Sequence, residues 1–289
     1  MAVSGGPDSL ALLLLAHAAL PGRVEAATVD HGLRAEAAAE AAFVARVCDE
    51  LGVRHATLDV TLAPGNLQAE ARAARYAALA NWAGERGLAA IVTAHHADDQ
   101  AETLLLRLGR ASGVAGLAGV RAVGKAGTGT TAVLRPLLGW RRGELGAIVA
   151  AAGIEAVHDP SNTDDRFDRA RLRKAMAEAD WIDVAALAAS AAHLAEADAA
   201  LDWATAREWA EQVERTALGI TYRPQAPRAI ALRVLTRIVT ELGGEAPRGG
   251  AAARLFDALV ARQPMSIGSL VARALPEGWS FMKAPQRRN

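Results

Sequence analysis

The residues best suited to chemistry are Ser4-Gly-Gly-Pro-Asp-Ser9, which stand between a short apolar lead-in and a longer apolar run. The two glycines would let backbone N–H groups approach a ligand without obstruction by a Cβ atom. A helix that begins near Asp8 would add unpaired N–H groups and the positive end of its dipole, and both serines add hydroxyl donors. The stretch therefore predicts a phosphate-binding loop. An ordinary turn, with Asp8 or Ser9 capping the helix, is the alternative that the loop alone leaves open.

A second polar cluster, His95-His-Ala-Asp-Asp-Gln-Ala-Glu102, combines imidazole and carboxylate groups. If Asp98 opens a helix, Asp98 and Glu102 lie one turn apart, and Asp99 occupies a neighbouring face. Two or three carboxylates beside a phosphate loop would suit Mg²⁺ that bridges polyphosphate oxygens. The alternative is an acidic helix start that complements the helix dipole.

Two pairs of arginines could bind phosphate, because a guanidinium donates bidentate hydrogen bonds and stays charged. Arg72 and Arg75 share one face of a predicted helix, and Arg169 and Arg173 lie one turn apart in a basic run. Solvated helix faces are the alternative, and for the first pair spacing alone favours it. For the second pair the preceding Ser161-Asn162 favours a functional role.

The elements that must position these residues alternate between strand and helix. Strands are predicted at residues 24–29, 55–60 and 89–94, while only residues 1–3 are available for a first strand, which is usually ~5–6 residues long. This alternation predicts an α/β fold with a doubly wound, mainly parallel sheet. The loop at 4–9, Asp30-His31 and the cluster at 95–102 all follow strands, so they should meet at the carboxyl edge of the sheet.

Beyond these strands, the sequence predicts a hairpin that joins residues 120–123 to 132–134, and a helix over 142–152. Beyond residue 165 the alanine- and leucine-rich pattern predicts helix to the end of the chain, with interruptions at residues 219–227 and 243–250. We expect one domain at residues 1–178 and a smaller, mostly helical domain at residues 179–289.

The bulk properties fit a soluble globular protein. Of the 289 residues, 52% are hydrophobic, which supplies a sizeable core, and no apolar run was found that approaches the ~20 residues needed to span a bilayer. The formal charge is zero, so local basic patches would have to make any nucleic-acid contacts. Cys48 is the single cysteine, is expected to be a buried inert thiol, and excludes an internal disulfide and a paired-cysteine site.

Seven segments in order resemble the tRNA(Ile)-lysidine synthetase family of PP-loop ATP pyrophosphatases. They span roughly the first 175 residues and comprise Val3–Ser9, Val29–Arg34, Ala71–Tyr76, Thr93–Thr103, Ser112–Leu117, Arg135–Leu138 and Asp159–Arg173. The resemblance implies a PP-loop, adenine nucleotide α-hydrolase-like fold. It also implies a cytoplasmic ligase that adenylates the wobble cytidine of a tRNA(Ile) with a CAU anticodon and then displaces AMP with L-lysine.

The resemblance also implies roles for individual residues. ATP would be held by Ser4, Gly5, Gly6, Pro7, Asp8 and Ser9, together with Asp30 and His31. Mg²⁺ would bind near Asp8, Asp98 and Asp99. The catalytic residues would be Asp8, Arg75, His95, Asp99 and Glu102. Of these, Asp99 and Glu102 would either recognise the cationic lysine or help to remove its proton. Arg169 and Arg173 would contact a substrate phosphate or the tRNA, and residues 179–289 would form a tRNA-binding domain.

The chain departs from the family pattern at three positions: Phe167 replaces the usual tyrosine, Ala170 an asparagine and Ala111 a glycine. Other PP-loop tRNA- or nucleotide-modifying enzymes, and a non-catalytic ATP- or tRNA-binding module, are the alternative functions. A thiolase would need paired cysteines, which Cys48 alone does not provide. The oligomeric state is unknown from sequence, and a homodimer is left open.

Overall fold

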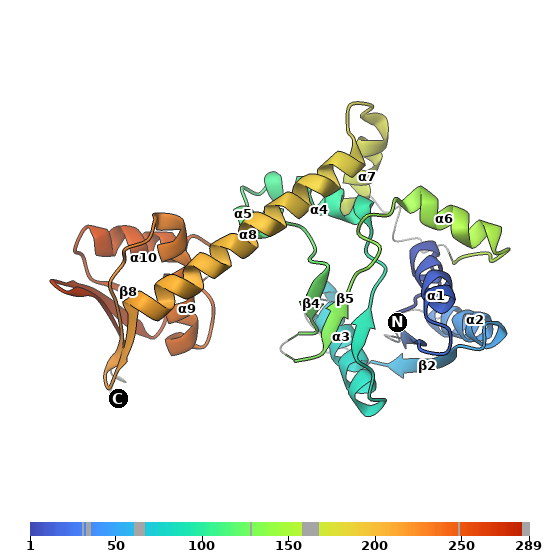
Figure 1. Ribbon diagram of the computed structural model, residues 1–289, viewed down its shortest axis with the longest axis horizontal. Helices are drawn as coiled ribbons and strands as arrows, with labels where there is room; N and C mark the ends of the chain where they lie inside the picture. Colours follow the sequence, from blue (N-terminus) through green and yellow to red (C-terminus); the bar gives the residue numbers. More distant parts are fainter. Residues whose placement is uncertain are drawn as a thin grey trace. The chain divides into compact units, whose positions relative to one another are not determined.

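The computed structural model describes residues 1–30, 32, 36–60, 67–127, 129–157, 168–247 and 249–284, and the chain divides into two compact units, Met1–Ala195 and Glu196–Asn289 (Figure 1). The elements up to the middle of α8 belong to the first unit. They are α1 (Pro7–Ala19), β1 (Glu25–Asp30), α2 (Glu36–Glu50), β2 (Arg54–Asp59), α3 (Leu67–Glu85), β3 (Ala90–Val92), α4 (Ala97–Leu108), α5 (Val114–Leu117), β4 (Val123–Lys125), β5 (Ala132–Leu134), α6 (Arg142–Ala151), α7 (Asp168–Glu178) and α8 (Val184–Gln212).

The strands of the first unit form a mainly parallel sheet through the short segment 1–3. β1 pairs with β2 in parallel, β3 pairs with β5 in parallel, and only β4 is antiparallel to its neighbour β5. Val3 N–H donates to the Ala27 carbonyl in β1, and Ala2 N–H donates to the Val92 carbonyl in β3, both at 2.9 Å. Residues 1–3 therefore join the two halves, and the predicted hairpin between β4 and β5 is confirmed.

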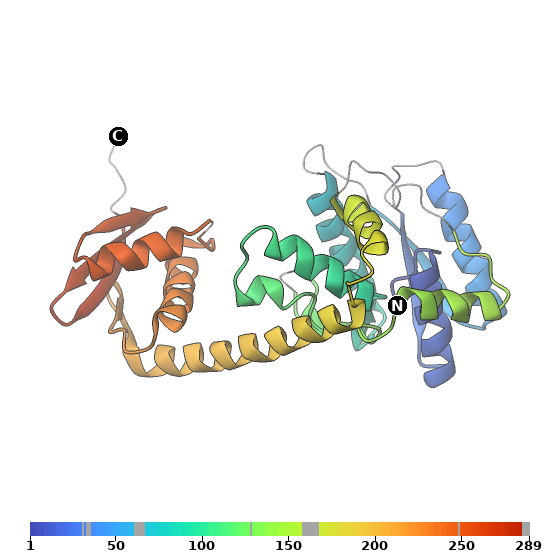
Figure 2. The same cartoon turned by 90° about the horizontal axis from the view of Figure 1, so that it is seen from above.

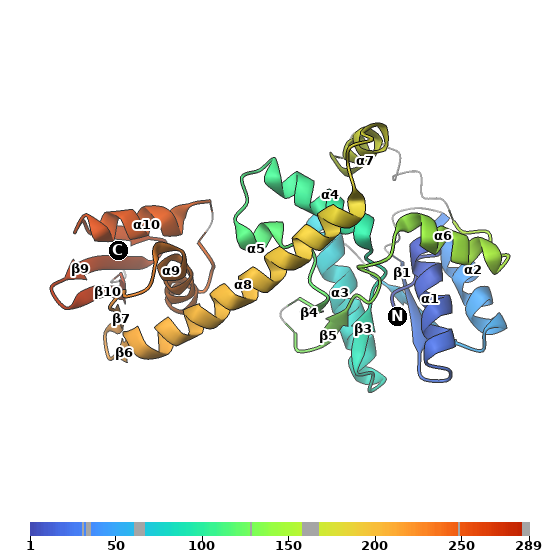
Figure 3. The same cartoon turned by 45° about the horizontal axis from the view of Figure 1, so that its top comes forward.

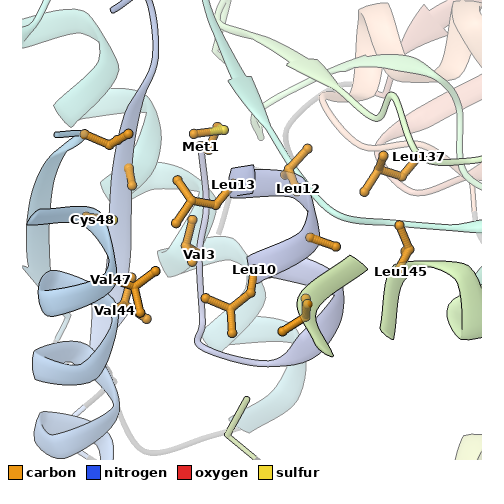
Figure 4. Close-up of a cluster of buried hydrophobic side chains, with 14 residues drawn as sticks. Met1, Val3, Leu10, Leu12, Leu13, Val44, Val47, Cys48, Leu137 and Leu145 are labelled. Carbon is orange, nitrogen blue, oxygen red and sulfur yellow. The ribbon is translucent and has the colours of Figure 1, made fainter. Parts of the chain in front are cut away.

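Helices cover both faces of this sheet. Ala26 of β1 packs into a core with Leu10 of α1 and Val44 of α2 (Figure 4). The next residue, Ala27, points the other way, into a core with Leu79 of α3. Figure 2 shows the same arrangement from above, with α1 and α2 on one side of β1 and α3 on the other. The predicted doubly wound α/β fold is confirmed.

The second unit is a helix-and-sheet structure with its own core. After α8 it contains β6 (Val213–Thr216), β7 (Gly219–Tyr222), α9 (Arg228–Gly243), α10 (Ala251–Val260), β8 (Met265–Ile267), β9 (Leu270–Leu275) and β10 (Gly278–Lys283). The strands form an antiparallel sheet in the order β6-β7-β10-β9-β8, which α9 and α10 cover (Figure 3).

The expectation of helix to the end of the chain is wrong for residues 213–216, which form β6, and for residues 265–283, which form β8, β9 and β10. These strands are short, and their stability comes from pairing with partners elsewhere in the sheet rather than from local preference. Helices still make up most of the regular structure after residue 178, as predicted. The chain divides into its two compact units within α8, after Ala195, while the predicted domain boundary at residue 178 stays a prediction.

Helix α8 is longer and more apolar than the sequence analysis expected of any segment. By length and composition alone it could cross a membrane, although this is weak evidence, because helices of soluble proteins pass the same test. In the second unit Asp198 and Asp202 of α8 form ion pairs with Arg233 of α9, which fixes this part of α8 to the protein.

Ala111 lies in the left-handed region, with φ of 52°. A glycine would adopt this conformation without strain, whereas alanine costs roughly 1–2 kcal/mol there. The departure noted in the sequence therefore falls at a position where the backbone favours glycine.

The two glycines of the loop have different conformational demands. Gly5 has φ of +83°, its carbonyl accepts a hydrogen bond from Val157 N–H (2.9 Å), and an added Cβ would lie 3.2 Å from Val157 Cγ2. Gly6 has φ of −74°, and an added Cβ would meet only Ser4 Oγ, at 3.9 Å. A side chain is therefore strained at the first position and tolerated by the fold at the second.

We expect Gly5→Ala to lower the free energy of unfolding by about 1–2 kcal/mol, because alanine must adopt a positive φ. Gly6→Ala is the matched control and should unfold as the wild type does in urea denaturation of the full chain. An equal loss of stability in both variants would contradict the assignment of backbone strain to Gly5.

Candidate functional site

The loop at residues 4–9 is closed by its own serines. Ser9 Oγ accepts a hydrogen bond from Ser4 N–H (3.1 Å) and donates one to the Gly6 carbonyl (3.0 Å). Ser4 Oγ lies 3.3 Å from Ser9 Oγ. Ser9 therefore shapes the loop rather than capping α1. Among the described residues no side chain caps α1 at Gly6, so the N–H groups of its first turn stay available to an anion. The arrangement fits a phosphate site better than an ordinary turn.

The loop meets the cluster at 95–102 through His96, which sits at the N-terminus of α4 and is only 1% exposed. His96 Nε2 lies 3.4 Å from Asp8 Oδ2 and 3.6 Å from Asp99 Oδ2. On the other side of the ring, His96 Nδ1 lies 3.6 Å from Asp98 Oδ2. One imidazole thus joins α1 to both carboxylates at the start of α4.

The charge of His96 follows from these neighbours. Burial on its own lowers the pKa of this imidazole, but the nearby carboxylates of Asp8, Asp98 and Asp99 outweigh burial and raise the pKa to about 9. His96 is therefore a cation at neutral pH. It offsets part of the negative charge that three neighbouring carboxylates would otherwise concentrate at one point.

Asp98 is committed to α6 as well as to His96. Its carboxylate accepts a hydrogen bond from Arg142 N–H (2.8 Å) and from the Arg141 guanidinium (3.3 Å). Burial alone would raise the pKa of Asp98, but His96, the Arg142 N–H group and Arg141 hold it well below the usual range. The predicted metal ligand Asp98 thus already holds the N-terminus of α6, which leaves little capacity for a cation.

Asp8 fits a cation better. Its Oδ1 atom is buried and has no hydrogen-bond partner among the described residues. Those residues contain no ready-made cage of three or more His, Cys, Asp or Glu ligands. Mg²⁺ does not need one, because it is usually held by one or two carboxylates together with substrate phosphates and water. The donors present, Asp8 and its neighbour Asp99, fit that kind of open site.

Asp99 and Glu102 lie next to Arg173 of α7. Glu102 is 2% exposed, and its carboxylate accepts two hydrogen bonds from Arg173, one from Nε and one from Nη2 (3.2 Å). Arg173 Nη2 also lies 3.9 Å from Asp99 Oδ1. Arg169, one turn earlier in α7, is exposed, with Nη2 3.5 Å from Thr103 Oγ1. The structure therefore brings Glu102 and Arg173 together as a pair, which the sequence did not predict.

His95 is neutral, unlike His96. Burial lowers the pKa of His95 to about 4, although the negative charge of Asp99 acts in the opposite direction. Three arginines lower it further: Arg135, Arg72 and Arg169. The His95 Nδ1 atom lies 2.9 Å from Thr93 Oγ1. A neutral imidazole surrounded by arginines is suited to hydrogen bonding beside an anionic substrate.

Two predicted residues are less closely tied to this site. Arg75 is exposed on α3 and forms no ion pair among the described residues. The charge of its neighbour Arg72 lowers the pKa of His95. Asp30 ends β1, and its Oδ1 accepts a hydrogen bond from Gly32 N–H (2.8 Å). His31 lies outside the described residues.

Sequence reasoning assigned no individual role to His96, Arg135 or Arg141, although His96 lies in the cluster at 95–102 and Arg135 opens one of the seven family-like segments. A histidine directly before an acidic helix start could have identified His96, because the N-cap side chain faces the first turn of its helix. The sequence does not reveal the hydrogen-bond partners of Arg141 and Arg135, because Asp98 and the Arg121 carbonyl come from other elements.

Comparisons with known proteins agree with this geometry. A family model described as a PP-loop domain matches residues 1–179. A protein of Novosphingobium aromaticivorans named tRNA(Ile)-lysidine synthase is 50% identical over 293 residues, which cover 100% of this chain and 90% of the relative. A protein of the same name from Zymomonas mobilis is 40% identical over 294 residues, with 100% and 89% covered.

Among solved structures, a U34-tRNA thiolase from Methanococcus maripaludis matches with a TM-score of 0.54 and 15% sequence identity, covering 68% of this chain and 70% of the thiolase. This likeness concerns the fold alone. From the domain match and the two relatives, the chain belongs to the tRNA(Ile)-lysidine synthase family of PP-loop proteins.

Proposed function

We propose that the chain is a ligase that joins L-lysine to the wobble cytidine of a tRNA(Ile) with a CAU anticodon. The cytidine 2-oxygen attacks the α-phosphorus of ATP, and pyrophosphate leaves. The ε-nitrogen of lysine then attacks C2 of the cytosine ring and AMP leaves. A proton from the amine passes to a general base. The observation that carries the proposal is that His96 Nε2 contacts the carboxylates of both Asp8 and Asp99. This contact places the loop at residues 4–9 beside the carboxylates at the start of α4.

The loop at residues 4–9 would hold the leaving pyrophosphate. Its free N–H groups at the start of α1 provide hydrogen-bond donors, and Ser9 fixes its shape through Ser4 and Gly6. Mg²⁺ bound by Asp8 and Asp99 would neutralise the negative charge that develops on that leaving group. Asp98 would contribute indirectly, by holding α6 in place beside this site.

The ε-amine of the lysine substrate would lie next to Asp99 and Glu102. A carboxylate there can hold the lysine ammonium group or take up its proton, and both roles need an anion within hydrogen-bond reach. His95, which is neutral, would donate or accept a hydrogen bond at the adenylate without adding charge. Arg75 and Asp30, with His31, would contact the nucleotide.

The tRNA would be bound by Arg169 and by the second unit. Arg169 is exposed, so its guanidinium is accessible to a phosphate. The unit at 196–289 has its own core and an antiparallel sheet, which allows it to serve as a separate binding module. ATP, lysine and tRNA are all present in the cytoplasm, where we expect this ligase to act.

Incubation of the full chain with ATP, Mg²⁺, labelled lysine and unmodified tRNA(Ile) should place label in the tRNA. The label should depend on ATP and on a cytidine at the wobble position, because adenylation precedes attack by the amine. A transcript with uridine at that position is the control. Absence of label in the cytidine transcript would refute the proposed function.

Asp8→Asn should slow tRNA-dependent pyrophosphate release at least about 100-fold, because it weakens the site for the Mg²⁺ that would neutralise the negative charge on the leaving group. Asp49→Asn, which changes an exposed carboxylate on α2, is the matched control and should keep the wild-type rate. Titration with Mg²⁺ provides a second readout, since a weakened metal site raises the concentration needed for half-maximal rate. A wild-type rate and Mg²⁺ dependence would show that Asp8 has no such role.

His96→Gln should destabilise the fold in a pH-dependent manner. The folded-state pKa of about 9 lies above the ordinary value of 6.5, so the stabilisation is fully present below pH 6.5 and is lost as pH rises through about 9. It amounts to on the order of 3 kcal/mol. Urea denaturation without added divalent ions should show a difference from wild type that shrinks between pH 6.5 and pH 10.

The control for this measurement is His193→Gln, which replaces an exposed histidine on α8. Its effect on the free energy of unfolding should be small at every pH. A loss in His96→Gln that stays constant across the range would mean that the imidazole is not a buried cation.

A further inference from the structure

The Arg173–Glu102 pair occupies the carboxylate that the proposed function assigns to the lysine substrate. Arg173 Nε and Nη2 both donate to Glu102, which is 2% exposed, while the Arg173 side chain itself is 23% exposed. The pair thus has a buried anion on α4 and a cation on α7 that solvent can partly reach. A guanidinium and an ammonium satisfy a carboxylate in the same way, by charge and by N–H donors.

The two cations exclude one another at Glu102. A lysine ammonium placed on this carboxylate while Arg173 stays bound would put two positive charges within a few Å of each other, in a site that excludes most water. Removal of Arg173 without replacement is also unfavourable, because it leaves Glu102 buried and unpaired. An exchange of one cation for another keeps the charge balanced throughout.

We propose, building on the ligase function above, that Arg173 holds the place of the lysine ammonium on Glu102 until a phosphate of the bound tRNA draws it away. Arg173 then acts as a specificity-determining residue. It keeps free amines off Glu102 in the absence of tRNA, and it gives up the carboxylate when the acceptor is in place.

The neighbouring residues on α7 support this exchange. Arg169 lies one turn before Arg173, is exposed, and approaches Thr103 on the same helix as Glu102. A phosphate bound by Arg169 would therefore lie within one helical turn of Arg173, and an arginine fork binds phosphate in the bidentate manner in which it binds Glu102. The phosphate can compete with Glu102 for Arg173 because the Arg173 side chain is partly accessible to solvent.

The inference predicts coupling between two binding events. Where the competent state is a minor population, the apparent dissociation constant of lysine rises in inverse proportion to that population. Binding of tRNA would release Glu102 and so tighten lysine binding, and lysine would tighten tRNA binding by the same factor.

Calorimetric titration of L-lysine into the full wild-type chain, without ATP, measures this coupling directly. Unmodified tRNA(Ile) transcript should lower the dissociation constant of lysine at least about fivefold. Arg173→Gln should bind lysine without tRNA at least about fivefold more tightly than wild type, and tRNA should add little. Glu102→Gln should lose lysine binding with and without tRNA.

Arg171→Gln is the matched control, because Arg171 is an exposed arginine of the same helix and pairs with Asp168. It should keep the wild-type coupling. Equal lysine affinity of the wild type with and without tRNA would overturn the inference, whether or not the Arg173 variant folds. Wild-type lysine affinity in Glu102→Gln would also overturn it.

The labelled-lysine assay separates this inference from the proposed function. If the wild type transfers lysine to the tRNA but shows no coupling, the exchange at Glu102 is wrong and the ligase function stands. If the wild type transfers no lysine, the function fails and the inference fails with it.

Discussion

A single buried positive charge governs the geometry of the site. His96 lies within 3.6 Å of carboxylate oxygens of Asp8, Asp98 and Asp99, which come from the first turns of α1 and α4. Without that charge, three anions would have to share a small volume that is largely closed to water, and mutual repulsion would drive them apart. The loop at residues 4–9, the start of α4 and, through Asp98, the start of α6 are therefore held at one point by electrostatics as well as by packing.

The extent to which sequence predicts this site depends on the range of each interaction. The loop at 4–9 and the acidic start of α4 are local patterns, and the order of strands places both at one edge of the sheet. The choice between His95 and His96 depends on knowing which residue directly precedes the first turn of α4, because adjacent residues there point in different directions and the start of a helix is uncertain from sequence by one or two residues. The sequence reading named His95, and the structure adds His96 as the residue that joins the carboxylates.

The same limit explains two other differences. Arg173 was grouped with a basic run and assigned to phosphate, but its partner Glu102 lies 71 residues away, and only the packing of α7 on α4 reveals the pair. The strands at 213–216 and 265–283 were missed because each is short and gains its stability from partners elsewhere in the sheet. In both cases the deciding energy comes from tertiary contacts rather than from local preference.

The segment at residues 1–3 has a consequence for synthesis of the protein. One edge of this segment pairs with Ala27, but the other pairs with Val92, which leaves the ribosome much later. Until β3 has emerged, the strand that carries the phosphate loop has one unpaired edge, and such edges invite wrong pairing. A nascent chain would therefore acquire a braced nucleotide site only after β3 has left the ribosome, so ATP could favour the native state only from that point in translation.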